Sequence, residues 1–234
     1  MTNAMRSRLD VIILRGARPY AEVMEAMRAT HDARRAGARA SDALVVCEHA
    51  DVITIGKRTS DGLNALRSAR EVLEAKAIAF AHSDRGGGAT AHAPGQVVAY
   101  PIVALRARGL GARSYVELLE DVAIDVCASY GIKANGKIPG REGVWVGEKK
   151  IAAIGVKISG GVSAHGAAIN VTNDLGVFDH IVACGLEGYG VTSVAKELGI
   201  AAVDRADAET RAVDCFARRF GYHEVFYRRE ERAG

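Results

Sequence analysis

The sequence predicts an α+β fold, a single domain in which helices flank a mixed or antiparallel sheet. The chain has 234 residues, of which 49% are hydrophobic and 25% charged, a length that buries a substantial core and favours one domain over two. Short apolar segments come in pairs interrupted by single helical patterns, without a regular βαβ alternation. No apolar run approaches the roughly 20 residues of a membrane span, and no secretory leader precedes the first apolar stretch. We therefore expect a cytoplasmic protein.

The N-terminal third is expected to begin with a strand over residues 11–14, followed by a helix that starts at Pro19. Proline is tolerated there because the first N–H groups of a helix have no intrahelical partner. Apolar residues continue at helical spacing from Tyr20 to Met27, and Gly37 ends the pattern. Further strands are predicted at 43–47, 52–55 and 77–81, and a helix at 67–76.

The remainder of the chain alternates between helices and apolar strands. Ser114 and Glu117 have the spacing of a capping box, which predicts the start of a helix that Gly131 ends. Strands are predicted at 97–102, 143–146, 150–158, 164–171 and 223–227, helices at 193–198 and 207–220, and a loop at 178–190.

Charge and cysteine content exclude several classes of function. The net charge is only +3 and the basic residues are scattered, which argues against nucleic acid as the main ligand. The four cysteines, Cys47, Cys127, Cys184 and Cys215, form no CxxC pair, so neither a structural zinc site nor a disulfide framework is indicated. Each cysteine is then either a buried residue that packs in the core or a reactive thiol, and core packing is the usual role of a lone cysteine.

The segment from Asp84 to Gln96 is the densest run of unusual residues. Its glycines allow backbone N–H groups to approach a ligand, Arg85 could position a polar group, and His92 could exchange a proton. A solvent-exposed hairpin loop explains the same composition equally well. The segment is neither a Walker loop nor a GxGxxG motif, so it indicates no particular nucleotide.

Three later segments could also carry chemistry. Lys150 heads an apolar strand and could reach a cleft, although a lysine more often protects a strand edge. His165 lies among small residues that leave room for an apolar ligand, and by itself it indicates a half-buried histidine. Cys184 precedes Gly185, which frees the backbone beside the thiol for an oxyanion site. None of these segments is decisive alone.

Together and in this order, the segments resemble one family, the lipoate-pathway octanoyltransferases of the biotin/lipoate protein ligase superfamily. The resemblance covers roughly residues 10–200. It is carried by Glu48-His49, Thr54 to Arg58, Arg85 to His92, Pro94-Gly-Gln96, Tyr100-Pro101, Gly143 to Val146, Lys150 to Gly155, His165-Gly166, Asn170-Val171, Asp174-Leu175 and Cys184-Gly185. Ala93 and Ala183 stand where the family usually has glycine and proline, which bears on fine specificity more than on activity.

The resemblance implies a reaction and the residues that perform it. An octanoyl group would pass from acyl carrier protein to a lysine of a lipoyl domain, in 2-oxoacid dehydrogenase complexes or in the glycine cleavage H protein. The family's thioester-forming cysteine corresponds to Cys184, and the lysine that lowers its pKa to Lys150. Residues 1–234 would form one catalytic domain, with a helix and a strand in 207–227. The implied acyl-binding residues are Arg85, Gly86, Gly87, Gly88, Ala89, Thr90, Ala91, His92, Ala153, Ile154, Gly155, Gly166, Ala167 and Ala168.

This reading predicts ping-pong transfer without a cofactor, because the incoming thioester is already activated. ATP and metal ions are not expected to take part, and neither nucleic acid nor a membrane is an expected partner. Two alternatives stay open. An ATP-dependent lipoate or biotin ligase would need no nucleophilic cysteine, and a non-catalytic module would bind the acyl group or its carrier without chemistry.

Overall fold

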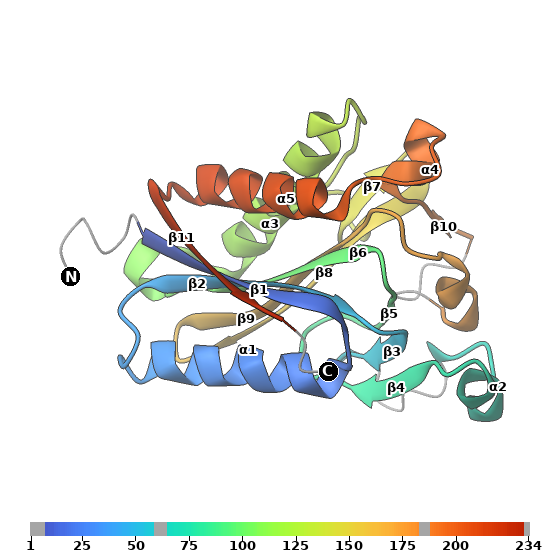
Figure 1. Cartoon of the computed structure of the whole chain (residues 1–234), viewed down its shortest axis with the longest axis horizontal. Coiled ribbons are helices and arrows are strands. Elements are labelled where there is room, and N and C mark those ends of the chain that lie inside the picture. Colours follow the sequence, from blue (N-terminus) through green and yellow to red (C-terminus); the bar gives the residue numbers. More distant parts are fainter. Residues whose placement is uncertain (1–7, 59–64, 183–187, 232–234) are drawn as a thin grey trace.

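The computed structural model describes residues 8–58, 65–182 and 188–231. Helices cover both faces of a large sheet, and a small sheet lies beside one end of it (Figure 1). This arrangement confirms the predicted α+β class with a mixed sheet and flanking helices. No helix in the described ranges is long and apolar enough to cross a membrane.

The large sheet has the strand order β10-β8-β9-β6-β2-β1-β11, and β7 pairs with β8 outside this path. Its central pairs β2·β6, β6·β9 and β8·β9 are antiparallel, whereas β1 runs parallel to both β2 and β11. Its strands are β1 (Arg8–Arg18), β2 (Asp42–His49), β6 (Gln96–Ile102), β7 (Val144–Val146), β8 (Lys149–Ser159), β9 (Val162–Asn170), β10 (Gly190–Val191) and β11 (Glu224–Glu230).

The small sheet contains β4 (Ala79–His82), β3 (Val52–Ile55) and β5 (Ala89–His92) in that order. Strand β5 was not predicted, because its sequence Ala-Thr-Ala-His offers no large apolar residue and follows three glycines. It pairs antiparallel with β3, so that Thr54 lies opposite Thr90. The segment expected to be a loop or a binding element is therefore a glycine turn followed by a buried strand.

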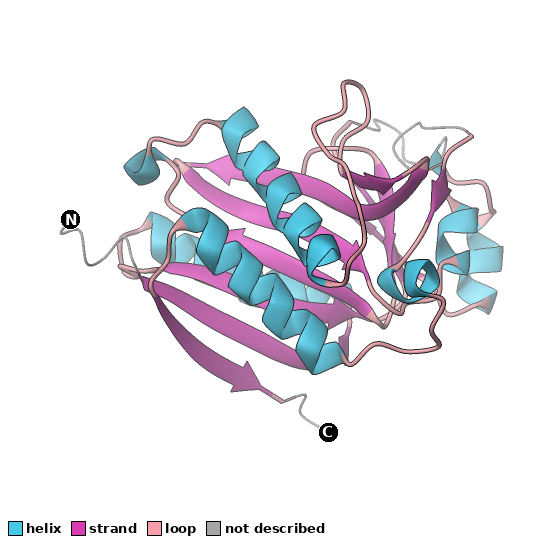
Figure 2. Ribbon diagram, turned by 90° about the horizontal axis from the view of Figure 1, so that it is seen from above, coloured by secondary structure: helices cyan, strands magenta, loops and turns pink. Residues whose placement is uncertain are grey.

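Three helices form the two outer layers. Helix α1 (Tyr20–Arg35) covers one face of the large sheet, and α3 (Ala112–Ser129) and α5 (Arg205–Phe220) lie side by side on the other (Figures 1 and 2). Apolar side chains of the sheet pack against α1 in one core cluster and against α3 and α5 in another. The shorter helices are α2 (Arg70–Ala75), α4 (Val194–Leu198) and the 3-10 turns η3 (Arg106–Arg108) and η4 (Gly176–His180).

Two sequence expectations about helix ends and loops were wrong. Helix α3 begins at Ala112 with Gly111 as its N-cap, so Ser114 lies inside the helix and the predicted capping box does not form. The Glu117 carboxylate instead accepts a hydrogen bond from Arg113. The segment 178–190 is not entirely loop, because η4 extends to His180 and β10 begins at Gly190. Ser193 and Asp204 cap α4 and α5 through their side chains.

Candidate active site

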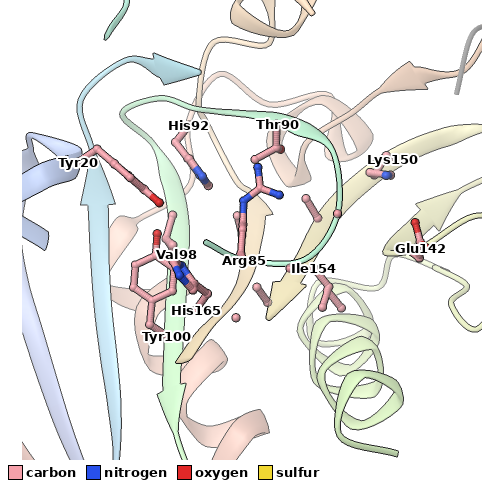
Figure 3. A pocket seen from close by; sticks show the side chains of 16 residues that line it. Tyr20, Arg85, Thr90, His92, Val98, Tyr100, Glu142, Lys150, Ile154 and His165 are labelled. Carbon is pink, nitrogen blue, oxygen red and sulfur yellow. The ribbon is translucent and has the colours of Figure 1, made fainter. Parts of the chain in front are cut away.

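A pocket opens where the two sheets and the start of α1 meet (Figure 3). The small residues of β8 and β9 form much of its wall, and aromatic and charged side chains complete it. It is lined by Tyr20, Arg85, Gly87, Thr90, His92, Val98, Tyr100, Glu142, Lys150, Ala153, Ile154, Gly155, His165, Gly166, Ala167 and Ala168. In Figure 3, Lys150 and Glu142 lie at one end of this lining, and Tyr20 and Tyr100 lie at the other.

The pocket brings together most of the residues that the resemblance implied, although they come from three separate segments. Eleven of those residues line it: Arg85, Gly87, Thr90, His92, Lys150, Ala153, Ile154, Gly155, Gly166, Ala167 and Ala168. Alternation along β5 sends Thr90 and His92 into the pocket, while Ala89 and Ala91 turn into the core of the small sheet. Gly86 lines an adjoining groove, and Gly88 lies outside both cavities. Cys184 lies outside the described residues.

Arg85 is fixed within the protein. Its Nη2 donates to the Thr54 carbonyl at 2.9 Å and to the Thr54 hydroxyl at 2.8 Å, and its Nη1 donates to the Gly86 carbonyl at 3.0 Å. Two glycines make room for the side chain: a Cβ on Gly56 would lie 2.8 Å from Arg85 Nη1, and one on Gly155 would lie 3.0 Å from its Cδ. The guanidinium therefore binds the β3 backbone to the glycine turn and gives the pocket a rigid wall.

The end of the pocket away from Lys150 is a network of neutral polar groups. The Tyr20 hydroxyl lies 2.9 Å from Ser83 Oγ, and the Tyr100 hydroxyl lies 2.8 Å from His49 Nε2. His92 lies 2.7 Å from Gln96 Oε1 through Nδ1. Burial lowers the pKa of His92 to about 4 and holds that of His49 well below its usual range. At neutral pH this end therefore carries uncharged rings in fixed positions.

The neutral state of His92 predicts acid sensitivity of the fold. Its folded pKa of about 4 lies below the unfolded value near 6.5, so its stabilising contribution is complete above pH 6.5 and is lost as the pH falls towards 4. Linkage gives about 2 kcal/mol less free energy of unfolding at pH 5 than at pH 7.5. Urea unfolding at both values should show at least this difference, because burial also lowers the pKa of His49, and His92→Gln should reduce it by about 2 kcal/mol. His223→Gln, at an exposed site, is the control; an unchanged difference in His92→Gln would contradict the assignment.

A second polar group ties the glycine turn to the large sheet. Asp84 accepts hydrogen bonds from Lys157 and His165, both at 2.6 Å. Although burial raises the pKa of Asp84, these two donors hold it well below its usual range. His165 has a φ of +57°, which costs a non-glycine residue roughly 1–3 kcal/mol, and the Asp84 bond offsets that cost. The bond between Asp84 and His165 fixes the orientation of the His165 imidazole in the pocket lining.

Lys150 places an ammonium group at the other end of the pocket. The residue is only 7% exposed, yet its Nζ makes no hydrogen bond or ion pair with any residue in the described ranges. Lys149 is exposed, as the alternation of the strand predicts. A nearly buried cation that faces a cavity without a hydrogen-bond or ion-pair partner is costly, and such groups concentrate at functional sites.

The three cysteines in the described ranges are poor nucleophiles. Cys47, Cys127 and Cys215 are all buried. Burial raises the pKa of each thiol, to about 12 for Cys127, so each remains protonated at neutral pH. None lines the pocket. The usual interpretation of a lone cysteine as a core-packing residue therefore holds for these three.

Sequence reasoning missed three of the lining residues. Tyr20 belongs to an apolar helical stripe that predicts core packing, and only the tertiary arrangement turns its hydroxyl towards Ser83. Val98 is an ordinary strand residue. Glu142 comes from the turn before β7, where its carboxylate binds Arg58, 84 residues earlier in the chain. An ion pair at that separation has no sequence signal.

Comparison with known proteins shows which family this chain belongs to. Residues 19–217 match the lipoyl protein ligase A/B catalytic domain. The octanoyltransferase of Rubrobacter xylanophilus is 44% identical over 195 residues, which cover 83% of this chain and 86% of that protein. The mitochondrial octanoyltransferase LIP2 of Arabidopsis thaliana is 39% identical over 81% of this chain and 80% of its own. The chain belongs to the lipoyl protein ligase A/B catalytic-domain family.

Solved structures agree with this family assignment at the level of the fold. A lipoate-protein ligase A bound with ATP superposes with a TM-score of 0.69 at 15% identity, over 96% of this chain and 90% of the other. A lipoate protein ligase from Thermoplasma acidophilum gives 0.69 at 16% identity, over 96% and 88%. The family match therefore confirms the resemblance, and the pocket lies within the matched residues.

Proposed function

We propose that this protein is an octanoyltransferase that moves an octanoyl group from acyl carrier protein to a lysine of lipoyl domains. Its relatives at 39–45% identity carry that name. The structural observation that supports it best is the nearly buried Lys150, whose ammonium has no hydrogen-bond or ion-pair partner among the described residues, at one end of a pocket walled largely by small apolar residues. Residues 1–234 act as one catalytic domain in this proposal, which serves the lipoyl domains of 2-oxoacid dehydrogenases and the glycine cleavage H protein.

Cys184 is the nucleophile in this proposal, and the strand pairing beside it supports the assignment. Gly190 and Val191 pair with Lys149 and Lys150. Cys184 stands six positions before Gly190 in the sequence, a chain length of at most about 20 Å, which permits the thiol to approach the Lys150 ammonium. Val182, on the other side, is hydrogen-bonded to Ala65. The raised thiol pKa values of the other three cysteines leave Cys184 as the best candidate.

The proposed reaction has two acyl transfers of the same kind. The Cys184 thiolate attacks the carrier thioester, the bond between the carbonyl carbon and the carrier sulfur breaks, and the departing sulfur takes a proton from Lys150. Neutral Lys150 then accepts a proton from the target lysine, whose amine attacks the acyl-enzyme. The new amide forms as the bond to the Cys184 sulfur breaks, and the attacking nitrogen loses its second proton to solvent, which restores the Cys184 thiolate beside the Lys150 ammonium. Each step exchanges one acyl bond for another without oxidation or reduction.

Mass spectrometry tests the covalent step directly. The protein is mixed with octanoyl carrier protein, without ATP and without an acceptor, and we expect an increase of one octanoyl group that peptide mapping assigns to Cys184. Cys184→Ala should show no adduct and no transfer, whereas Cys127→Ala, at a buried site outside the pocket, should retain both. Transfer by Cys184→Ala would contradict the thioester scheme.

A second experiment, with a lipoyl domain added and with or without ATP and free octanoate, separates the two alternatives. Octanoylation of a lipoyl domain that required ATP and free acid would indicate a ligase. A carrier thioester that stayed intact with both partners present would indicate a binding module.

A further inference from the structure

Trp145 is the closest aromatic neighbour of the Lys150 ammonium among the described residues. Lys150 Nζ lies 4.9 Å from the centroid of the indole ring, within the roughly 6 Å range of a cation–π contact. Trp145 is only 1% exposed and is not among the residues that line the pocket, so its ring contacts the lysine from within the protein. Where both partners are shielded from water, this attraction is stronger than on an open surface.

An irregularity in the strand pairing creates the contact. Val144 pairs with Ala152 and Trp145 pairs with Lys150, so Ile151 is an additional residue in β8 and forms a bulge. A regular register would place Trp145 opposite Ile151, whose side chain points to the other face of the strand. Gly143 permits the approach: its φ is +99°, and a Cβ there would lie 2.4 Å from the Ala152 carbonyl oxygen.

The indole ring is fixed on its other sides. Trp145 Nε1 donates to the Arg141 carbonyl at 3.2 Å. Tyr189 meets the ring at 73° with centroids 5.5 Å apart, and the Arg141 guanidinium lies 4.0 Å from the centroid of Tyr189. A ring held in this way cannot turn aside when the lysine moves, so it can define where the ammonium lies.

The carboxylate nearest to Lys150 in the pocket wall already has a partner. The Glu142 carboxylate accepts hydrogen bonds from both terminal nitrogens of Arg58, at 2.5 and 2.7 Å. The Arg58 bond lowers the pKa of Glu142 against its partial burial, and the Lys150 charge adds to the effect. The Glu142 carboxylate thus attracts the Lys150 ammonium electrostatically but forms no hydrogen bond with it. The π face of Trp145 supplies the direct contact.

We infer that Trp145 is a positioning residue that holds the Lys150 ammonium at the pocket by a cation–π contact. The inference rests on the proposed role of Lys150 in acyl transfer. An indole face attracts an ammonium group but accepts no proton from it. Lys150 therefore stays oriented while it remains free to give a proton to the carrier sulfur and to take one from the target lysine.

Fluorescence tests the contact itself, because Trp145 is the only tryptophan in the chain. Lys150→Met removes the cation beside the indole and should change the intensity or the wavelength of the emission of the folded protein. Lys149→Met removes an equal charge on the exposed side of β8 and should leave the emission unchanged. Equal spectra for Lys150→Met and the wild type would overturn the inference whatever the activity.

Kinetics test the positioning role. Trp145→Phe retains an aromatic face, whereas Trp145→Leu keeps apolar bulk without one. Loss of the contact in Trp145→Leu should lower the single-turnover rate of octanoyl transfer about tenfold, while Trp145→Phe should stay within about threefold of the wild type. Both variants lose the Nε1 hydrogen bond, so a purely structural role would affect them alike.

Combination with Lys150→Met distinguishes the two proposals. In that background, alkylation of Cys184 should be equally fast with Trp, Phe or Leu at position 145, since the charge is gone. If Trp145→Leu still slowed the alkylation of Cys184 in the Lys150→Met background, the inference would be overturned. Full octanoyl transfer by Lys150→Met would instead contradict the proposed function of Lys150, and the fluorescence result would still decide whether the contact exists.

Discussion

Lys150→Met is expected to slow octanoyl transfer by a factor of about 10²–10⁴ and, at the same time, to stabilise the fold. The kinetic loss is that typical of a missing proton-transfer group. The gain in stability follows from burial: Lys150 is 7% exposed as a residue and its ammonium lacks a hydrogen-bond partner among the described residues, so an apolar side chain of similar length should raise the free energy of unfolding by about 1 kcal/mol.

Three measurements check this pair of effects. Single-turnover transfer gives the rate, urea unfolding gives the stability, and the rate of thiol alkylation at neutral pH reports the reactivity of Cys184, because the other three cysteines are buried. Alkylation should also be slower in Lys150→Met. Lys149→Met should change none of the three, since Lys149 is exposed. A Lys150→Met protein that alkylates at the wild-type rate would refute the assigned role, and one that is less stable would refute the burial argument.

Gly166→Ala is expected to destabilise the protein by about 3 kcal/mol or more and to abolish transfer. A Cβ at this position would lie 2.2 Å from the Ala99 carbonyl oxygen and 2.5 Å from Pro101 Cδ. Both atoms belong to β6, the central strand beside β9, so neither can move without separating the sheet. Overpacking of this kind commonly costs 1–3 kcal/mol, and a backbone obstacle leaves little room for relief.

Gly190→Ala is the matched control for this substitution. It makes the same change in β10, where the nearest atom to the new Cβ would be Lys149 Cγ at 3.4 Å, an ordinary contact with a flexible side chain. Chemical denaturation should therefore show a large shift for Gly166→Ala and less than about 1 kcal/mol for Gly190→Ala. Gly166→Ala with wild-type stability would mean that β6 and β9 are not packed as closely as described.

The strands with large apolar residues were predictable from sequence, and the others were not. Strand β3 has the predicted bounds because Val-Ile-Thr-Ile carries a strong β-propensity. Strand β5 was missed because its alternation is between alanines and the polar residues Thr90 and His92. Helix α3 was found from its apolar face, but its start was misplaced: the capping box at Ser114 is a local pattern, and the chain enters the helix earlier, at Gly111.

The lining of the site was largely predictable because it lies in ordered blocks of one family. The contacts that hold it were not. Arg85 was a candidate for substrate contact, yet its guanidinium binds Thr54 and the glycine turn. The bond between Arg58 and Glu142 and the register that sets Trp145 against Lys150 join segments whose proximity only the folded sheet creates. Such long-range pairs depend on tertiary packing, which leaves no period or spacing in the sequence.

The packing of Arg85 also restricts the order in which this pocket can change. Side chains at Gly56 and Gly155 would each meet Arg85 within about 3.0 Å, and a Cβ on Gly56 would also lie 2.4 Å from the Gly87 carbonyl oxygen. A larger residue at Gly155 would therefore need a shorter side chain at position 85, and its Cβ would still lie 3.0 Å from the Gly86 carbonyl oxygen. In directed evolution for longer or branched acyl groups, a substitution of Arg85 should therefore precede one of Gly155. Libraries that randomise Gly155 alone should return almost only glycine.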